Sequence, residues 1–266
     1  MKVKDYFLTK EEFELKEIQK GILQTVNLPK DLNKYYESDE YLSHSNNKKN
    51  LIGNLYAFVQ KLNLNYKYKI ISKYNKNGKI LDYGCGNGVF LNYIQTKNYK
   101  GKGYEPNEDA KKSSLKMGLN LIENLNADEK FDVITLWHVL EHIPNPDEIL
   151  EKLKLLLTEK GKLIIAVPNY KSFDAEYYKE YWAAYDVPRH IFHYSKDGAI
   201  SFFRQNNFKI ENIFPLPFDS YFISMMSAKY KKGLINKIFS PFVGIISNLK
   251  AMKTGNYSSL IYVLKK

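Results

Sequence analysis

A glycine-rich loop that directly follows a short apolar run constrains this chain more than any other feature. Residues 79–83 predict a strand, residues 84–88 read GCGNG, and residues 89–97 predict a helix. Glycine tolerates positive φ angles and lets a ligand approach the backbone closely. The first turn of the following helix leaves N–H groups without partners. We therefore expect a ligand to bind where the strand, the loop and the helix meet.

The rest of the chain continues this alternation. Strands are predicted at 101–105, 119–123, 131–137, 161–167, 208–215 and 258–264, and helices at 107–117, 146–157 and 196–206. Strands that alternate with helices predict an α/β fold with a doubly wound sheet. An insertion at 217–257 separates the last two strands, so we expect an atypical end to the sheet. Before the sheet, apolar spacing favours a helix within 46–74 and, weakly, another at 11–22.

Two acidic residues stand at predicted strand ends near the loop. Asp82 closes the first strand, and Glu105 follows Gly88 by 17 residues, a spacing typical of an acidic side chain that binds a ribose diol. A nicotinamide dinucleotide site is one interpretation. However, its pattern needs a small residue at the position of Val89, and a pyrophosphate fits poorly beside Asp82. An amino-acid ammonium group would fit there better.

The order of these motifs resembles class I S-adenosylmethionine-dependent methyltransferases, and most of all the ubiquinone-methylase-like group, which includes types 11 and 23. The resemblance rests on ILDYGCGNG (80–88), GYEPN (103–107), FDVI through HVLEHI (131–143) and GKLIIAVPN (161–169). It implies a Rossmann-like sheet with an antiparallel final strand, and methyl transfer from S-adenosylmethionine, which leaves S-adenosylhomocysteine. With it we expect a helical N-terminal segment over 1–78 and a methyltransferase domain over 79–266, with a lid-like insertion at 217–257.

The resemblance also implies which residues bind the cofactor. The glycines would pass beneath its methionine part, Asp82 would lie near its ammonium group, and Glu105 would accept from the ribose hydroxyls. The cofactor-binding residues expected are Tyr36, Asp82, Gly84, Cys85, Gly86, Gly88, Glu105, Pro106, Asn124, Leu125, Trp137 and His138. We also expect the aromatic residues before the first long helix to lie near the sulfonium, because a cation is attracted to a ring face; they are Tyr35, Tyr36, Tyr41 and His44. Packing at a helix junction explains them equally well.

Four of the five histidines fall in two pairs. His138 and His142 belong to an H-x-x-E-H sequence, which is formally the inverted zinc-protease motif. That motif requires a continuous helix, whereas His138 follows a strand and prolines at 144 and 146 shorten the helical stretch. We therefore expect no metal site.

The second pair lies in a segment after the fifth strand, where open α/β sheets bind ligands. His190 is a candidate general base, because a near-neutral imidazole can take a proton from a hydroxyl group. Arg189, one of only two arginines, would use its planar fork to hold Asp186 or an anionic substrate. A purely structural clamp is the alternative for this segment. The catalytic candidates are Asp186, His138, His142, Arg189 and His190.

The net charge of +11 first suggests nucleic acid, but its distribution argues against that partner. Residues 79–214 carry a net charge of −1, whereas 1–78 carry +5 and 215–266 carry +7. Nearly all the cations are lysines, and base or phosphate recognition favours arginine. The single cysteine, Cys85, fits a reducing compartment such as the cytoplasm.

The insertion at 217–257 combines lysines with apolar residues at helical spacing. It fits either a lid over the substrate or a peripheral membrane element. We favour the lid, because Pro241 should interrupt a long helix. We expect a methyltransferase that acts on a small-molecule or lipid-like acceptor. Two alternatives are an inactive cofactor-binding module and, less favoured, a nicotinamide-dependent oxidoreductase.

Overall fold

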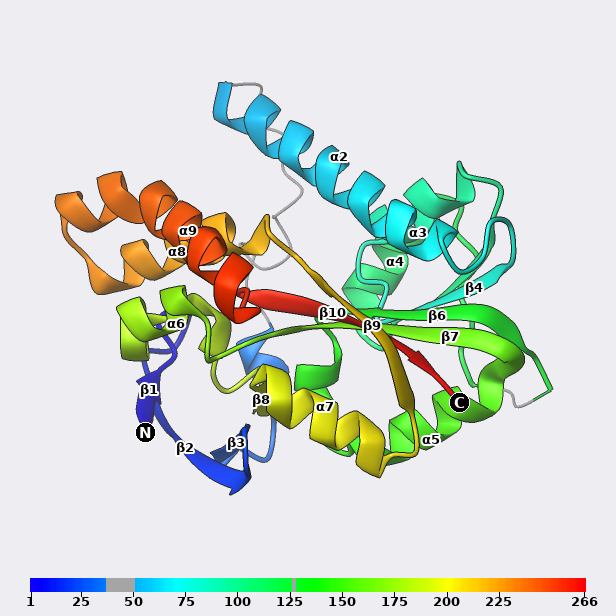
Figure 1. Cartoon of the computed structure of the whole chain (residues 1–266), viewed down its shortest axis with the longest axis horizontal. Coiled ribbons are helices and arrows are strands. Elements are labelled where there is room, and N and C mark those ends of the chain that lie inside the picture. The colour runs from blue at the N-terminus through cyan, green and yellow to red at the C-terminus, as the bar shows by residue number, and fades with distance from the viewer. Residues whose placement is uncertain (37–50, 126–127) are drawn as a thin grey trace.

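The computed structural model describes residues 1–36, 51–125 and 128–266. It contains a central sheet of six strands with helices on both faces, and a smaller sheet beside it (Figure 1). Tyr41 and His44, which we expected to lie near the sulfonium, fall outside the described residues.

The central sheet has the strand order β5-β4-β6-β7-β10-β9. Its strands are β4 (Lys79–Tyr83), β5 (Lys100–Tyr104), β6 (Phe131–Trp137), β7 (Leu157–Pro168), β9 (Lys209–Pro215) and β10 (Ser259–Lys265). Strand β4 runs parallel to β5 and β6, and β6 runs parallel to β7. Strand β10 is antiparallel to both β7 and β9. The predicted doubly wound α/β sheet with an antiparallel final strand is thus confirmed.

Alternating residues of these strands form two cores, one on each face. Ile80, Val133 and Ile164 pack with α2 (Leu51–Ser72) and α3 (Val89–Gln95). Their neighbours Leu81, Ile134 and Leu163 pack on the other face with α5 (Pro146–Leu156) and α7 (Lys196–Gln205). Strands buried on both faces are the reason that the sequence reads as continuous apolar runs here. Helix α4 (Glu108–Lys116) follows β5 at the edge of the sheet.

The N-terminal segment departs from its prediction. The helix expected at 11–22 is wrong, because the chain there forms β2 (Glu12–Gln19) and then β3 (Ile22–Val26). With β1 (Lys2–Lys4) and β8 (Phe192–Tyr194) they make a four-stranded antiparallel sheet in the order β1-β2-β3-β8. Phe13 and Leu15 are buried and the glutamates between and beside them are not, which is the two-residue period of a strand.

Two further local predictions are corrected. The weak strand expected at 119–123 is reduced to a single bridge between Leu121 and Gly103. Pro241 does not interrupt its helix, because α9 (Leu234–Thr254) runs through it. A proline at this position deprives the carbonyl of Lys237 of its usual N–H donor, and the Ser240 hydroxyl donates to that carbonyl instead, at 3.0 Å.

The remaining helices lie close to the smaller sheet. They are α6 (Phe173–Tyr178) and α8 (Asp219–Lys231), with short 3₁₀ turns at η1 (Asn33–Tyr35), η3 (Leu140–His142), η4 (Lys179–Tyr181) and η5 (Ala183–Tyr185). Helices α8 and α9 form a hairpin that extends away from the central sheet (Figure 1). None of the helices in the described part of the chain is long and apolar enough to cross a membrane.

Candidate active site

The glycine loop is closely packed at both ends and open in the middle. Gly84, Gly86 and Gly88 all have positive φ angles, of 73°, 55° and 77°. A Cβ on Gly84 would lie 2.5 Å from Val139 Cγ2, and one on Gly88 would lie 2.2 Å from Leu119 Cδ1. A Cβ on Gly86 would meet nothing within 4 Å among the described residues. The loop therefore leaves a space above Gly86 that a ligand can enter against the bare backbone.

Glu105 holds this loop against the next strand–helix turn. One carboxylate oxygen accepts from the backbone N–H of Gly86 at 2.8 Å, and the other accepts from that of Asn107 at 2.9 Å. Partial burial raises the pKa of Glu105, and these two N–H groups oppose that rise. Each oxygen has a further lone pair, so this carboxylate can also accept from two adjacent hydroxyl groups of a ligand.

Asp82 lies at the end of β4, beneath the loop. Its carboxyl group is buried and accepts from the Thr135 hydroxyl at 2.7 Å. Burial raises the pKa of Asp82 to about 7, and the Thr135 hydroxyl and the charge of Lys67 moderate the rise. Lys67 lies 4.4 Å from the ring centre of Trp137, whose buried Nε1–H has no hydrogen-bond partner among the described residues. A buried carboxyl group can pair with a ligand's positive charge, and a donor without a partner can bind its negative charge. The two groups together therefore suit a zwitterionic ligand.

His138 follows directly after β6, with a left-handed backbone at φ 57°. Its Nδ1 lies 3.3 Å from Glu141 Oε1, and its Nε2 lies 2.8 Å from Asp219 Oδ2. Burial works against a charged ring, but the two carboxylates outweigh it and raise the pKa of His138 to about 9. Both ring nitrogens lie beside carboxylates, an arrangement that favours a positioning role for His138 over direct catalysis; its catalytic role stays a prediction.

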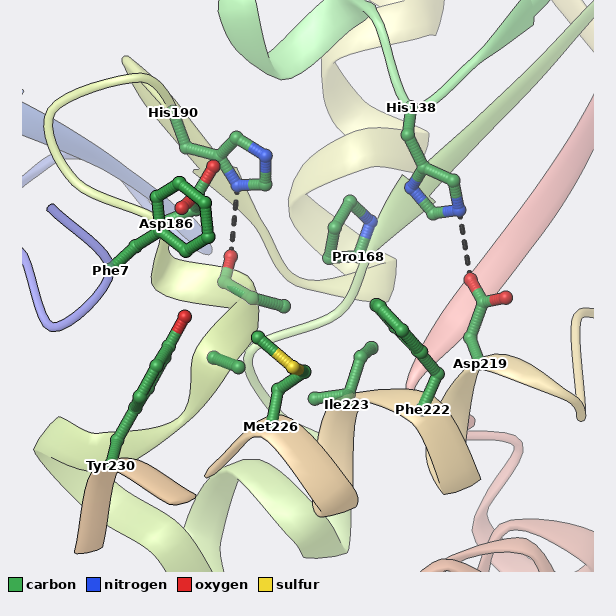
Figure 2. A pocket seen from close by; sticks show the side chains of 12 residues that line it. Phe7, His138, Pro168, Asp186, His190, Asp219, Phe222, Ile223, Met226 and Tyr230 are labelled. Carbon is green, nitrogen blue, oxygen red and sulfur yellow. Dashed lines mark hydrogen bonds and ion pairs between the residues drawn. The ribbon is translucent and has the colours of Figure 1, made fainter. Parts of the chain in front are cut away.

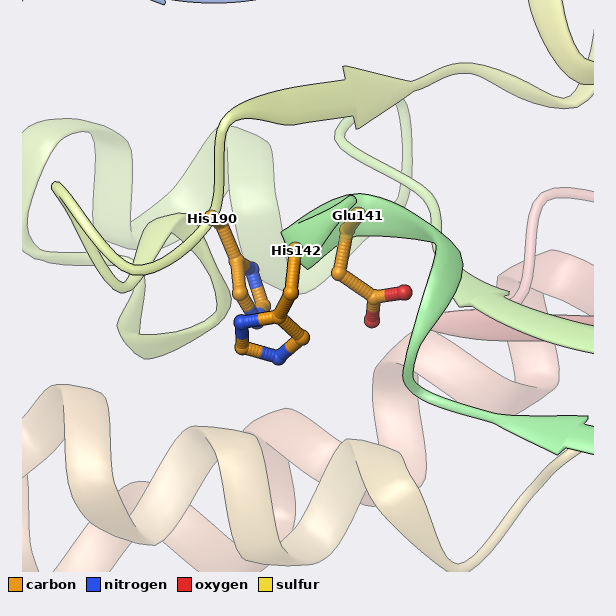
Figure 3. Close-up of side chains that lie close together, drawn as sticks. All are labelled: Glu141, His142 and His190. Atoms are coloured by element: carbon orange, nitrogen blue, oxygen red, sulfur yellow. The ribbon is translucent and has the colours of Figure 1, made fainter. Parts of the chain in front are cut away.

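His142 and His190 lie together with Glu141 (Figure 3). Nδ1 of His142 is 3.0 Å from the Arg189 carbonyl and 3.3 Å from the Tyr36 hydroxyl. Nδ1 of His190 is 2.9 Å from the Ala184 carbonyl. A carbonyl oxygen can only accept, so in the neutral form each ring carries its proton on Nδ1 and has its lone pair on Nε2. The centres of the two imidazole rings are 4.5 Å apart.

The titration of this cluster follows from its burial. Burial, together with the neighbouring His190, lowers the pKa of His142 to about 4. Burial also disfavours the charged form of Glu141, but the hydrogen bond from His138 and the charges of nearby histidines outweigh this and lower its pKa. Oε2 of Glu141 has no hydrogen-bond partner among the described residues. One ligand atom from each of Glu141, His142 and His190 lies within 4.8 Å of the others, which is a donor set that can hold a divalent metal ion.

Arg189 points away from this cluster into a clamp. Its guanidinium group donates to both carboxylate oxygens of Asp186, to Asp5 Oδ1 at 3.2 Å and to the Tyr35 carbonyl at 3.1 Å. Of the two roles considered for Arg189, the geometry therefore supports holding Asp186, and its role in catalysis stays a prediction. Burial disfavours ionisation of Asp186, but Arg189 reverses this and lowers its pKa.

The smaller sheet fixes the segment that carries His190. The Thr25 hydroxyl in β3 donates to the His190 carbonyl at 2.7 Å, and its backbone N–H donates to Ile191 at 2.8 Å. Nε2 of His193 lies 3.0 Å from the same hydroxyl, and burial holds the pKa of His193 well below its ordinary range. The N-terminal strands thus anchor the backbone on which His190 stands.

A cavity of about 270 Å³ lies between these residues and α8. Figure 2 shows His138 and His190 entering from one side and the side chains of α8 from the other. Apolar side chains dominate the lining; they are Phe7, Pro168, Ala183, Ala184, Phe222, Ile223, Met226 and Tyr230. Polar groups are contributed by His138, Asp186, His190 and Asp219. The cavity can hold a largely apolar molecule with one polar group near His190.

The other predicted residues have less defined roles. Burial raises the pKa of Cys85 to about 12, so its thiol is neutral and contributes packing. Pro106 and Asn124 are exposed and Leu125 is half-buried, close to residues 126–127, which are not described. Four residues of the site were not among those predicted: Asp5, Phe7, Lys67 and Asp219. Glu141 was visible in the H-x-x-E-H sequence, but no local signal connects the other four to the site.

The central sheet has a Rossmann-like arrangement, with Asp82 near the end of β4 and Glu105 directly after β5. Residues 54–213 match the family model described as a methyltransferase domain, and the chain belongs to this family.

Curated relatives resemble part of this chain in sequence, and solved structures resemble it in fold. A ubiquinone biosynthesis O-methyltransferase of Haemophilus ducreyi is 32% identical over 107 residues, which cover 34% of this chain and 45% of the relative. The chain thus matches about half the length of such relatives. A cyclopropane synthase from Mycobacterium tuberculosis has a TM-score of 0.54 at 12% identity, covering 87% of this chain and 95% of the other. A coclaurine N-methyltransferase bound to N-methylheliamine and S-adenosylhomocysteine has a TM-score of 0.51 at 16% identity, covering 76% and 71%.

Proposed function

We propose that this enzyme methylates a hydroxyl group on a small, largely apolar or lipid-like acceptor, with His190 as the general base. The observation that carries the proposal is the position of His190. It lines an apolar cavity, and its Nδ1–H is bound to the Ala184 carbonyl, so Nε2 keeps a lone pair for a proton. The name of the Haemophilus ducreyi relative, an O-methyltransferase, supports oxygen as the atom methylated.

On the cofactor side, the glycine loop and the two acidic residues would bind S-adenosylmethionine. Glu105 would accept from the ribose hydroxyls while it keeps its bonds to Gly86 and Asn107. Ionised Asp82 would face the ammonium group, and the orphaned Nε1–H of Trp137 would donate to the carboxylate. When bound, the cofactor supplies a methyl group on a sulfonium, which is reactive enough to need little covalent assistance. This chain then contributes chiefly position and the exclusion of water.

On the acceptor side, His190 would remove the hydroxyl proton as the new O–C bond forms and the methyl group's bond to the sulfonium sulfur breaks, which would leave S-adenosylhomocysteine. The resulting imidazolium would be stabilised by Asp186 and Glu141, both of which are held ionised by their cationic neighbours. Helix α8 would close the cavity through Phe222 and Met226, and the ion pair between Asp219 and His138 would hold the start of that helix against the site. The insertion at 217–257 therefore includes a lid in this proposal.

The test begins with binding and then measures transfer. Calorimetry should detect S-adenosylhomocysteine and not NAD, and labelled S-adenosylmethionine should methylate members of a panel of apolar alcohols and phenols. His190→Gln should keep the affinity for S-adenosylhomocysteine within about twofold and lower turnover by about 10²–10⁴. Unchanged turnover in this variant would refute the base assignment. Binding of the cofactor without transfer to any acceptor would favour the inactive-module alternative.

A second candidate mechanism is metal-assisted transfer, which the cluster of Glu141, His142 and His190 favours. A divalent ion held there would polarise the acceptor hydroxyl, and His190 would then be a ligand instead of a base. Turnover measured after chelation, and again after addition of Mg²⁺ or Mn²⁺, separates the two mechanisms. Loss and recovery of activity, with Glu141→Gln insensitive to the added ion, would establish the metal; unchanged activity after chelation would leave His190 as the base.

A further inference from the structure

The hairpin of α8 and α9 exposes an unusually large apolar surface. Nine large apolar side chains of α9 are between 40% and 74% exposed: Leu234, Ile235, Ile238, Phe239, Phe242, Ile245, Ile246, Leu249 and Met252. On α8, Phe222 and Met225 are also exposed. A helix on the surface of a protein in water normally turns such residues inward. We call these eleven side chains the apolar face.

The inward side of α9 carries small residues instead. Ser240, Gly244, Ser247 and Ala251 are buried and follow one another at helical spacing. A Cβ on Gly244 would lie 3.1 Å from the backbone of Tyr221 in α8, so the two helices touch closely there. Helix α8 turns Ser220, Ser224, Ser227 and Ala228 inward. Apart from Ile223 and Val243, the buried residues of the two helices are thus small or polar, and the large apolar residues lie outside. This is the arrangement of helices that pack in a lipid environment.

The charge of this region is one-sided. Residues 220–266 contain eight lysines and no acidic residue. Six of the lysines belong to the hairpin, at 229, 231, 232, 237, 250 and 253, and all six are exposed. The nearest acidic residue in the sequence, Asp219, is committed to His138. A cationic rim around an apolar face is typical of helices that lie in the interface of an anionic bilayer.

We propose that the hairpin of α8 and α9 docks on the surface of an anionic lipid bilayer, with the apolar face inserted among the lipid chains and the lysines at the headgroups. A second copy of the chain is the other obvious occupant. A symmetric dimer through this face would bring two sets of six lysines together with no carboxylate from either hairpin to neutralise them, since Asp219 is already paired. The charge therefore matches a bilayer and not a second copy.

Docking would also place the cavity next to the lipid, a consequence that rests on the proposed function. Phe222 belongs both to the apolar face and to the lining of the cavity, and Ile223 and Met226 follow it into the cavity. A membrane-borne acceptor could then pass along α8 toward His190 without crossing water. The class of acceptor that this geometry fits is a lipid-soluble alcohol or phenol.

The test is flotation of the full chain with vesicles, which needs no acceptor and no turnover. Vesicles of phosphatidylcholine with about 30% phosphatidylglycerol should carry the protein, and pure phosphatidylcholine should carry much less. Raising the salt from about 0.05 to 0.5 M should weaken binding to the anionic vesicles. The triple variant Lys232→Gln, Lys237→Gln, Lys253→Gln should lose about 100-fold in partitioning at low salt, because each lysine near the surface contributes about fivefold.

The apolar face is tested by Ile235→Ser, Phe239→Ser and Phe242→Ser together. Partitioning should fall by at least about 100-fold, because all three side chains are exposed in water and would insert into lipid. The matched control replaces three exposed apolar residues elsewhere, as Ile18→Ser, Leu115→Ser and Leu155→Ser, and should float like the unaltered protein. Both variants should bind S-adenosylhomocysteine as the parent does.

Three results would overturn the proposal: failure of the unaltered protein to float with anionic vesicles, equal flotation of the Ile235, Phe239 and Phe242 variant, or a dimer that this variant abolishes in the absence of vesicle binding. The last would assign the face to a second copy. Absence of methyl transfer would count against the proposed function alone, because flotation measures the surface independently of chemistry.

Discussion

Replacement of Arg189 by methionine should cost this protein much of its stability. The side chain is 1% exposed and places its charge between two carboxylates. It donates to Asp186 through Nε at 3.0 Å and Nη2 at 2.5 Å, to Asp5 through Nη2 at 3.2 Å, and to the Tyr35 carbonyl through Nη1 at 3.1 Å. The clamp thereby joins the first residues of the chain to the segment that carries His190.

The magnitude depends on what each carboxylate retains. Loss of one partner from a buried ion pair costs about 3–5 kcal/mol, because the other charge stays buried and uncompensated. Asp5 keeps four other donors, from the backbone of Phe7, Leu8 and Thr9 and from the Thr9 hydroxyl. Asp186 loses both of its arginine hydrogen bonds, but its side chain is 23% exposed and water can reach it. We therefore expect the lower end, about 3 kcal/mol.

Urea denaturation at pH 7 measures this loss as a fall in the free energy of unfolding. Arg204→Met is the matched control, because the only other arginine of the chain is exposed on α7 and should change stability by less than about 0.5 kcal/mol. Arg189→Lys should fall between the two, since an ammonium group cannot fork to both oxygens of Asp186. The lowered pKa of Asp186 adds a pH test, because its share of the stability is present above its unfolded pKa and is lost as the pH falls through the folded one.

A loss below about 1 kcal/mol for Arg189→Met would refute the reasoning. It would mean that the two carboxylates do not need the guanidinium, either because they protonate readily or because water replaces it. Equal losses for Arg189→Met and Arg204→Met would refute it as well, since burial is the only difference on which the prediction depends.

Three further predictions concern the site. Gly86→Ala should lower stability by only about 1 kcal/mol, because of the positive φ at this position, yet it should weaken S-adenosylhomocysteine binding in calorimetry. Gly84→Ala, in contrast, should damage folding, because its Cβ would collide with Val139. The pKa of the Asp82 carboxyl group is raised to about 7, so below pH 7 binding of the cationic cofactor must displace a proton from it. Affinity for the cofactor should therefore fall about tenfold per pH unit below 7, and Asp82→Asn should abolish this dependence. The pKa of His138 is raised to about 9, so its ion pairs stabilise the fold fully below about pH 6.5 and are lost as the pH rises through 9. Asp219→Asn should reduce this fall of the free energy of unfolding with pH, as measured by urea titrations at a series of pH values. An unchanged pH dependence would contradict the prediction.

Local spacing was enough to predict that the glycine loop and Glu105 lie together. Gly84, Gly88 and Glu105 lie on one strand–loop–helix–strand unit, where chain connectivity alone brings them together. The N-terminal strands were not predictable in the same way. Residues 11–22 have apolar positions compatible with either period, and only pairing of β3 with β8, about 170 residues later, selects the extended form.

The acceptor side could not be derived from spacing, because its contacts join distant segments. Asp5 meets Arg189 across 184 positions, and Asp219 meets His138 across 81. These partners decide chemistry as well as packing. His138 and His142 are four residues apart and identical in type, yet the pKa of one is raised to about 9 and that of the other is lowered to about 4.

By itself, the sequence determined the doubly wound sheet and the ligand loop, since both depend on periodicity and turn chemistry over stretches of fewer than 30 residues. Only the tertiary structure decided which histidine keeps a free lone pair in the cavity, which arginine is buried, and which face of α9 is left to the solvent. Burial and partners at long sequence distance set these properties, and neither is encoded in local spacing. The lysine-rich insertion shows the difference most clearly: its composition allowed a lid or a membrane element, and its folded hairpin offers a surface for each.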